Sequence, residues 1–222
     1  MKKRLTLIAI LMAVLTQFAL AGDDWGNFAR YESMNDSLRT AGVSPKAVFM
    51  GNSITEGWVS QHPDFFTSNN FVGRGISGQT SYQNLLRFRD DVIALNPEMV
   101  VINCGTNDIA ENNHPYNEER TLGNIISMVE LARAAGIRPV LTSVLPSSLF
   151  YWHPEIENVA EKVRSLNARI EVYAAENELP FVDYYPALVN EDGGLKAEYS
   201  EDGVHPNGAG YEVMEACIME II

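Results

Sequence analysis

Cysteine is rare in this chain, with only Cys104 and Cys217 among its 222 residues. Cys104 ends an apolar run and Cys217 lies on the apolar stripe of a predicted C-terminal helix, so we expect two buried free thiols. The sequence contains no CxxC pair and no cluster of cysteine and histidine at metal-ligand spacing. It therefore predicts no disulfide framework, no metal and no cofactor.

Positive charge is also scarce, with 16 Lys and Arg against 29 Asp and Glu and a formal net charge of −13. An acidic surface of this kind repels the phosphates of nucleic acids and of anionic membranes, so we expect neither as a partner. Internal repeats, low-complexity tracts and long Pro/Gly/Ser linkers are absent from the sequence as well. The chain is therefore expected to carry one domain.

One long apolar run is present, over residues 5–20, between a basic start at residues 1–4 and the small-x-small tripeptide at residues 19–21. This combination predicts a secretory signal peptide that is cleaved after residue 21. An uncleaved membrane anchor is the alternative, but a helical span needs about 20 apolar residues. We expect a secreted or periplasmic domain over residues 22–222 without a membrane span. Its net charge would be −16 instead of −13, because three basic residues leave with the signal.

Short apolar runs alternate with longer helical patterns along the chain. The apolar runs predict strands at residues 47–50, 70–73, 99–102, 138–141 and 180–183. Apolar residues at helical spacing predict helices at residues 80–95, 118–135 and 158–176. This alternation predicts a parallel sheet that is covered by helices on both faces and binds its ligand beyond the carboxyl ends of the strands.

Polar motifs follow three of these predicted strands. Ser53 lies in Gly-Asn-Ser-Ile after the first strand, where a serine either caps the next helix or is exposed as a nucleophile. Gly78 follows the second strand, in a segment whose backbone N–H either faces an oxyanion or belongs to an ordinary turn. Asn107 follows the third strand in Gly-Thr-Asn-Asp, as an oxyanion donor or as part of an Asx-turn.

A fourth motif near the C-terminus is Asp-Gly-Val-His-Pro-Asn, with Asp202 three residues before His205. In a turn, these two positions can face each other. The carboxylate then accepts a hydrogen bond from Nδ1 of the imidazole and leaves Nε2 for a serine. A surface loop with a single histidine is the alternative. The three other histidines have no fixed acidic partner and are not candidates.

These four motifs, in this order, resemble the GDSL/SGNH hydrolases, and most closely the branch of the platelet-activating-factor acetylhydrolase-like esterases. The resemblance covers about residues 46–220. It implies a three-layer α/β/α fold with a parallel five-stranded sheet, of the flavodoxin-like type. It also implies that Ser53 is the nucleophile and that His205, oriented by Asp202, is its base. The N–H groups of Ser53 and Gly78 and the side chain of Asn107 would form the oxyanion hole.

The resemblance implies hydrolysis of a carboxylic ester through an acyl-serine. Since the sequence shows no deep hydrophobic lid, we expect a short acyl group such as acetate, on a small molecule or a carbohydrate. A lysophospholipase or lipase-type acyl hydrolase is one alternative. The other is a catalytically silent glycan-binding domain that has kept the fold.

Two positions depart from the family pattern, and three others are candidates for contact with substrate. Asn52 stands where the family has Asp and Ile54 where it has Leu; Asn keeps an acceptor oxygen but loses the charge. The candidates for substrate contact are Arg74, Gln79 and Trp152. Stabilisation of the loop by Arg74 and Gln79, and aromatic packing by Trp152, are the alternatives.

Overall fold

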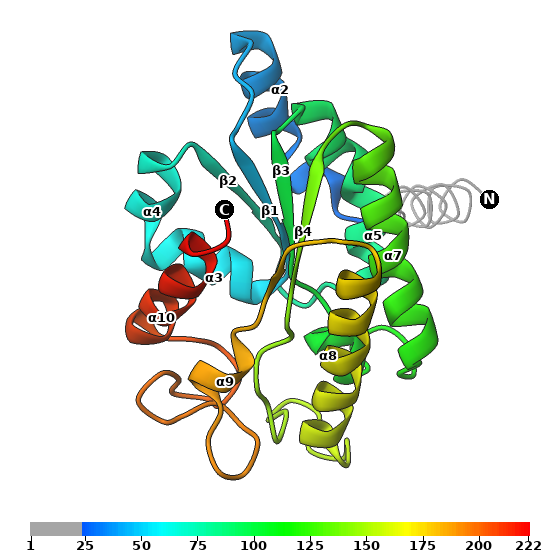
Figure 1. Ribbon diagram of the computed structural model, residues 1–222, viewed down its shortest axis with the longest axis vertical. Helices are drawn as coiled ribbons and strands as arrows, with labels where there is room; N and C mark the ends of the chain where they lie inside the picture. The colour runs from blue at the N-terminus through cyan, green and yellow to red at the C-terminus, as the bar shows by residue number, and fades with distance from the viewer. Residues whose placement is uncertain (1–23) are drawn as a thin grey trace, which may run out of the picture.

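The computed structural model describes residues 24–222, so the signal peptide predicted at residues 1–21 lies outside the described residues. Five parallel strands form one sheet in the order β2-β1-β3-β4-β5 (Figure 1). The strands are β1 Ala47–Gly51, β2 Phe71–Gly75, β3 Met99–Ile102, β4 Arg138–Thr142 and β5 Phe181–Val182. The predicted parallel five-stranded sheet is confirmed.

Helices precede, connect and follow the strands. They are η1 Phe28–Arg30, α2 Glu32–Ala41, α3 Ser53–Gln61, α4 Pro63–Ser68, α5 Ser81–Asp91, η2 Ile93–Leu95, α6 Thr106–Ile109, α7 Glu118–Ala134, α8 Val159–Glu176, α9 Tyr185–Leu188 and α10 Gly208–Met219. The helix predicted at residues 80–95 is divided, because the backbone leaves the helical region at Val92. Helix α2 was not among the predicted elements.

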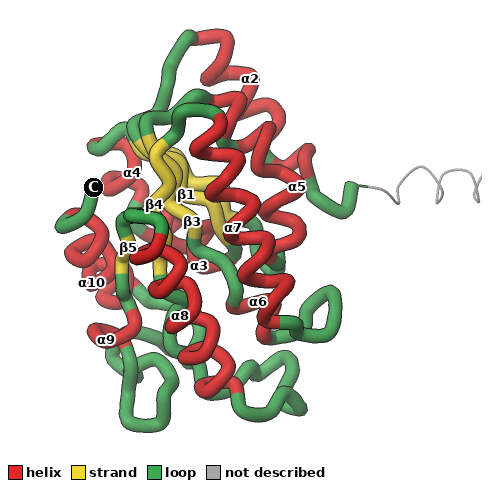
Figure 2. The backbone as a smooth tube through the Cα atoms, turned by 45° about the vertical axis from the view of Figure 1, so that its right-hand side comes forward, coloured by secondary structure: helices red, strands yellow, loops and turns green. Residues whose placement is uncertain are grey.

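Two hydrophobic clusters lie on the two faces of the sheet, because successive side chains of a strand point to opposite faces. Val48 and Met50 of β1 belong to a cluster with residues of α5, α7 and α8. Ala47 and Phe49 belong to a second cluster with residues of α3, α4 and α10. Figure 2 shows the strands between these two groups of helices. The molecule therefore has the three layers expected of an α/β/α fold.

Both cysteines are free thiols in the described part of the chain. Cys104 is buried as predicted, whereas Cys217 on α10 is only half-buried. Between residues 24 and 222, no helix combines the length and the apolar character that crossing a membrane requires. The same part of the chain contains no group of three or more His, Cys, Asp or Glu side chains placed to hold a metal ion.

The ends of β1 and β2 lie unusually close to the start of α3. A Cβ atom on Gly75, the last residue of β2, would lie 2.4 Å from the carbonyl oxygen of Asn52 and 2.4 Å from the nitrogen of Glu56. Only glycine allows this approach. It brings the segment after β2 beside the residue that begins α3, which is Ser53.

Candidate active site

Ser53 is the first residue of α3, and the residue before it caps the helix. Oδ1 of Asn52 accepts a hydrogen bond from the N–H of Ile54 at 3.0 Å. The capping role considered for Ser53 therefore belongs to Asn52. The Ser53 hydroxyl lies instead 2.8 Å from Nε2 of His205, at hydrogen-bond distance.

The capping bond explains how Asn can replace Asp at position 52. The side chain uses only its acceptor oxygen, which both residues have. Its Nδ2 is buried and lacks a hydrogen-bond partner among residues 24–222. The substitution thus keeps the geometry of the turn but removes a negative charge beside Ser53, at the expense of a buried unpaired donor.

Asp202 and His205 lie on one short loop before α10. Nδ1 of His205 is 2.7 Å from Oδ2 of Asp202, so the imidazole has the carboxylate on one side and Ser53 on the other. Oδ1 of Asp202 accepts hydrogen bonds from the N–H groups of Val204 at 2.9 Å and His205 at 2.8 Å. The predicted spacing of three residues therefore does bring the acid and the imidazole together.

These hydrogen bonds favour the charged form of Asp202. Partial burial acts to raise the pKa of Asp202, but the N–H groups of His205 and Val204 and the imidazole of His205 together hold that pKa below its usual value. The carboxylate is therefore ionised at neutral pH. It can fix the imidazole with its proton on Nδ1, which leaves Nε2 as an acceptor for the serine proton.

The segment after β2 contains Ser77, which lines a groove together with Ser53 and His205, and Gly78 follows it. Gly78 has φ +77°, a conformation that glycine adopts readily. Within the described residues, neither the N–H of Gly78 nor that of Ser53 donates to another protein group. Ser77 is tied to α3, because its N–H donates to Oε2 of Glu56 at 2.9 Å. The N–H groups of Ser53 and Gly78 are therefore both available to a further acceptor.

Asn107 lies on the short helix α6 after β3, and its side chain is buried. Its Nδ2 donates to the carbonyl oxygen of Gln79 at 2.9 Å, which leaves one N–H of the amide for another acceptor. Asp108, the next residue, has its partners on α5 and α7. It accepts hydrogen bonds from the N–H and the hydroxyl of Ser81 at the start of α5, and burial raises its pKa.

The structure gives Arg74 and Gln79 protein partners. The buried Arg74 guanidinium donates to Oδ1 of Asn35 and to the carbonyl of Gly73. The buried Gln79 amide donates to the carbonyl of Gly26 and accepts from Nε of Arg87. These contacts favour a role for both side chains in stabilising the loop, which was the alternative to substrate contact.

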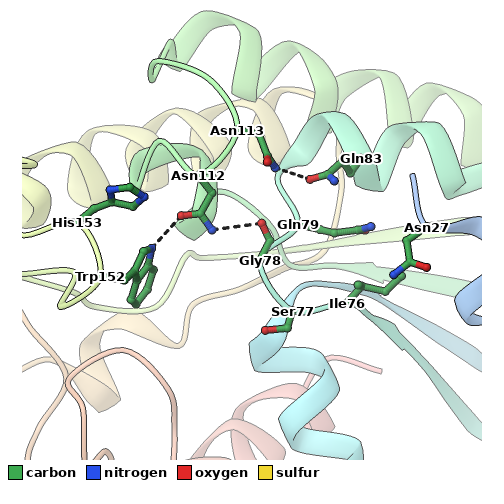
Figure 3. Close-up of a pocket in the computed structure, with 10 residues that line it drawn as sticks. All are labelled: Asn27, Ile76, Ser77, Gly78, Gln79, Gln83, Asn112, Asn113, Trp152 and His153. Carbon is green, nitrogen blue, oxygen red and sulfur yellow. Dashed lines mark hydrogen bonds between the residues drawn. The ribbon is translucent and has the colours of Figure 1, made fainter. Parts of the chain in front are cut away.

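Trp152 lies next to the predicted base, with its ring centre 6.2 Å from that of His205. Its Nε1 donates to Oδ1 of Asn112 at 2.8 Å. Together with Gly78, His153 and several amide side chains, it lines a cavity of about 440 Å³ (Figure 3). Of the three candidates for substrate contact, Trp152 is the one that lies beside the imidazole.

A larger groove, of about 1010 Å³, follows the edge strand β2. Ser53, Ser77 and His205 line one part of it. Its apolar lining comes from Met34, Leu38, Val59, Phe66, Phe71 and Val72. The sequence analysis did not predict this groove, since part of its wall is α2.

Two polar residues of the site were also missed from the sequence. Glu56 is three residues after Ser53, so both lie on one face of α3, and this spacing could have identified it. Asn112 is five residues after Asn107, just beyond α6. Its position in a polar run gave no signal that it would turn back toward Gly78.

Residues 49–213 match the model of the GDSL-like lipase/acylhydrolase family. The chain belongs to this family. A GDSL-like lipase from Bacteroides thetaiotaomicron VPI-5482 is 55% identical, with a TM-score of 0.85, over 89% of this chain and 97% of that one. A protein of Bacteroides fragilis NCTC 9343 that is classed with the acylhydrolases is 54% identical, with a TM-score of 0.86, over 89% and 96% of the two chains.

A curated relative is more distant. The uncharacterized lipoprotein YqeF of Bacillus subtilis strain 168 is 27% identical over 55% of this chain. This chain spans only 58% of the length of YqeF. Membership of the family therefore rests on the family model and on the two solved structures.

Proposed function

We propose that this chain is an exported serine esterase that hydrolyses carboxylic esters with a short acyl group, such as acetate, on a small molecule or a carbohydrate. The observation that carries the proposal is the chain of contacts from Asp202 through His205 to the Ser53 hydroxyl, at 2.7 and 2.8 Å. The N–H groups of Ser53 and Gly78, unpaired within residues 24–222, and the second amide N–H of Asn107 serve as the oxyanion hole.

In the first half of the reaction, Oγ of Ser53 bonds to the ester carbonyl carbon while its proton passes to Nε2 of His205. The carbonyl π electrons move to the oxygen, where the oxyanion donors stabilise the charge. When the C=O bond re-forms, the bond to the alcohol oxygen breaks, and this oxygen takes the proton from the imidazolium. Asp202 remains ionised throughout and stabilises the imidazolium.

In the second half, water attacks the acyl carbon of the acyl-Ser53. One water proton passes to Nε2 of His205, and the carbonyl oxygen again receives the electron pair. The bond between the acyl carbon and Oγ then breaks, and Oγ takes the proton back. The carboxylic acid leaves, and the site has returned to its starting state.

Labelling with a fluorophosphonate, together with turnover of 4-nitrophenyl acetate, tests this proposal. The wild-type chain should be labelled and active, and Ser53→Ala should lose both properties while keeping its melting temperature. Ser60→Ala is a matched control, because Ser60 lies on the same helix and lines the same groove without a contact to His205. An unlabelled, inactive wild-type protein that binds glycans would support the silent binding domain instead.

The acyl length separates this proposal from a second candidate, a lipase-type hydrolase. The small cavity beside Gly78 and Trp152 supports a short acyl group, whereas the apolar groove along β2 favours a long chain. We expect 4-nitrophenyl acetate to exceed the dodecanoate by about tenfold in kcat/KM, or about 1.4 kcal/mol. A preference for dodecanoate that Met34→Lys removes, without an effect on acetate, would favour the second candidate, since Met34 lines the groove and is 53% exposed.

Export is supported by the basic start, the apolar run and the small-x-small tripeptide of residues 1–21. The relative YqeF is itself a lipoprotein. Protein recovered from its native host should begin near Gly22 and lie outside the cytoplasm. Intact Met1 on most of the purified protein would contradict this part of the proposal.

A further inference from the structure

The side chain of Asn112 connects two of the proposed oxyanion donors. Its Nδ2 donates to the carbonyl oxygen of Gly78 at 3.2 Å and to Oδ1 of Asn107 at 3.0 Å. Its Oδ1 accepts from Nε1 of Trp152 at 2.8 Å. Figure 3 shows the Asn112 amide between the indole on one side and the Gly78 carbonyl on the other.

The chemistry of these two neighbours determines the orientation of the Asn112 amide. An indole N–H can only donate a hydrogen bond, and a backbone carbonyl can only accept one. Turning the amide by half a rotation would set its NH₂ group against the indole N–H of Trp152 and its oxygen against the carbonyl of Gly78. Both hydrogen bonds would be replaced by repulsion, so only one orientation is compatible with this site.

This orientation is passed on to Asn107. An asparagine amide has a broad, roughly two-fold torsion, so the orientation of Asn107 is set by its hydrogen-bond partners, the carbonyl of Gln79 and the NH₂ group of Asn112. Because Asn112 presents an NH₂ group, the Asn107 amide must turn its oxygen toward Asn112 to accept the hydrogen bond. The NH₂ group of Asn107 then lies toward the carbonyl of Gln79, with which it bonds at 2.9 Å, and its second N–H is available to an oxyanion.

The opposite orientation of Asn107 would harm the reaction. The amide oxygen would then face the place where negative charge develops, and a stabilising donor would become a repelling acceptor. We propose that Asn112, itself held by Trp152, is a positioning residue that fixes the amide of Asn107 and the peptide of Gly78 for oxyanion stabilisation. This inference rests on the proposed function, since Asn112 has no such role unless Asn107 and Gly78 bind an oxyanion.

Asn112→Ala and Asn112→Asp test the proposal with 4-nitrophenyl acetate as substrate. Both should lower kcat by about tenfold to a hundredfold and leave KM within about twofold, because the loss falls on the transition state. Asp fills the same volume but cannot donate, so a role in packing alone would spare this variant. Affinity for a boronic acid that forms a tetrahedral adduct on Ser53 should fall in parallel with kcat.

Asn124→Ala is the matched control. Asn124 is a half-buried amide like Asn112, but it lies on α7 outside the cavity, and its Nδ2 donates to the Ser81 hydroxyl at 2.9 Å. This variant should keep kcat. A loss in Asn124→Ala equal to that in Asn112→Ala would indicate that removing any half-buried amide lowers activity, and would overturn the proposal.

Trp152→Phe tests the anchor of the network. The substitution removes the indole N–H but keeps an aromatic ring beside His205. Without this donor, Asn112 is oriented by Gly78 and Asn107 alone. We expect a smaller fall in kcat than for Asn112→Ala, about three- to tenfold. A larger fall than for Asn112→Ala would assign the Trp152 ring a role of its own, and the anchoring role would be wrong.

A double variant separates the failure of this inference from the failure of the proposed function. In an Asn107→Ala chain, adding Asn112→Ala should lower kcat much less than it does in the wild-type chain, because the positioned group is gone. If Asn107→Ala lowers kcat while Asn112→Ala leaves it unchanged, the positioning role is wrong and the proposed function stands. If Ser53→Ala and Asn107→Ala both keep full activity, the proposed function fails, and this inference fails with it.

Discussion

The base loop, residues 200–206, and the oxyanion loop, residues 76–79, differ in which hydrogen bonds position their functional groups. In the base loop, every hydrogen bond accepted by the Asp202 carboxylate comes from within three residues. The donors are the Ser200 hydroxyl, the N–H groups of Val204 and His205, and the His205 imidazole. The loop is closed by a bridge between Ser200 and Pro206. Its geometry is therefore set by its own residues.

The oxyanion loop is fixed by other elements. The N–H of Ser77 donates to Glu56 on α3, and the carbonyl of Gly78 accepts from Asn112. The carbonyl of Gln79 accepts from Asn107 on α6. These contacts reach up to 34 residues along the chain. One local bond, from the N–H of Gln79 to the carbonyl of Ile76 at 3.2 Å, closes a turn, but the other contacts come from distant parts of the chain, so packing contributes most to the conformation of this loop.

The difference predicts how each loop responds to substitution. In the base loop, one carboxylate orients both the backbone and the imidazole, so its loss should remove the whole function. The oxyanion loop is held by several residues, so the removal of any one of them should lower activity only in part. Substitutions in the base loop should also destabilise the fold less than substitutions around the oxyanion loop. A closed local loop can unfold with few consequences for the layers of the fold.

Asp202→Asn should produce the largest effect, a fall in kcat of about 10⁴. The Asn amide can donate to Nδ1 of His205, which shifts the imidazole proton to Nε2 and leaves no acceptor for the Ser53 hydroxyl. Steady-state turnover of 4-nitrophenyl acetate and circular dichroism measure activity and fold together. Glu201→Gln, at the exposed acid next to it, is the control and should keep kcat. A loss of less than tenfold in Asp202→Asn would contradict the assignment.

Asn107→Ala should follow, with a fall in kcat of about 10² to 10³, or about 2.7–4 kcal/mol, and little change in KM. The donor that is lost acts on the charge that develops in the transition state. If Asn107 only forms a turn, its loss should instead lower the melting temperature and spare turnover per folded molecule. Measuring both quantities on one variant decides between these roles.

The same contrast explains what could be predicted from the sequence. The strands and the main helices follow from apolar periodicity, and the pairing of Asp202 with His205 follows from a spacing of three residues. The bonds from Glu56 and Asn112 to the oxyanion loop could not be predicted, because they depend on how α3 and the end of α6 pack against that loop. The groove was missed for a related reason, since α2, which forms part of its wall, was itself not predicted.

Glu56 offers a test of the shared support of the oxyanion loop. Glu56→Ala removes the acceptor of the Ser77 N–H and should lower kcat by about tenfold, as the Gly78 N–H loses its alignment. Glu56→Gln keeps an acceptor and should restore most of the activity. Arg30→Ala is the control, because Arg30 bonds to Oε1 of the same carboxylate at 2.9 Å but does not touch the loop. An Arg30→Ala loss as large as that of Glu56→Ala would assign the effect to the ion pair.

The smallest effect concerns the stability of the base loop and its dependence on pH. The hydrogen bonds to Asp202 lower its pKa in the folded chain relative to an unfolded pKa of about 3.9. A lowered pKa means that the carboxylate contributes stability above pH 4 and that this contribution is lost as the pH falls through the folded pKa. The melting temperature of the wild-type chain should therefore exceed that of Asp202→Asn at pH 8. The difference should shrink below pH 4.

Because the side chain is about one third exposed, the effect should also weaken in high salt. A difference that stays constant down to pH 2 would show that Asp202 stabilises the loop by its shape and not by its charge.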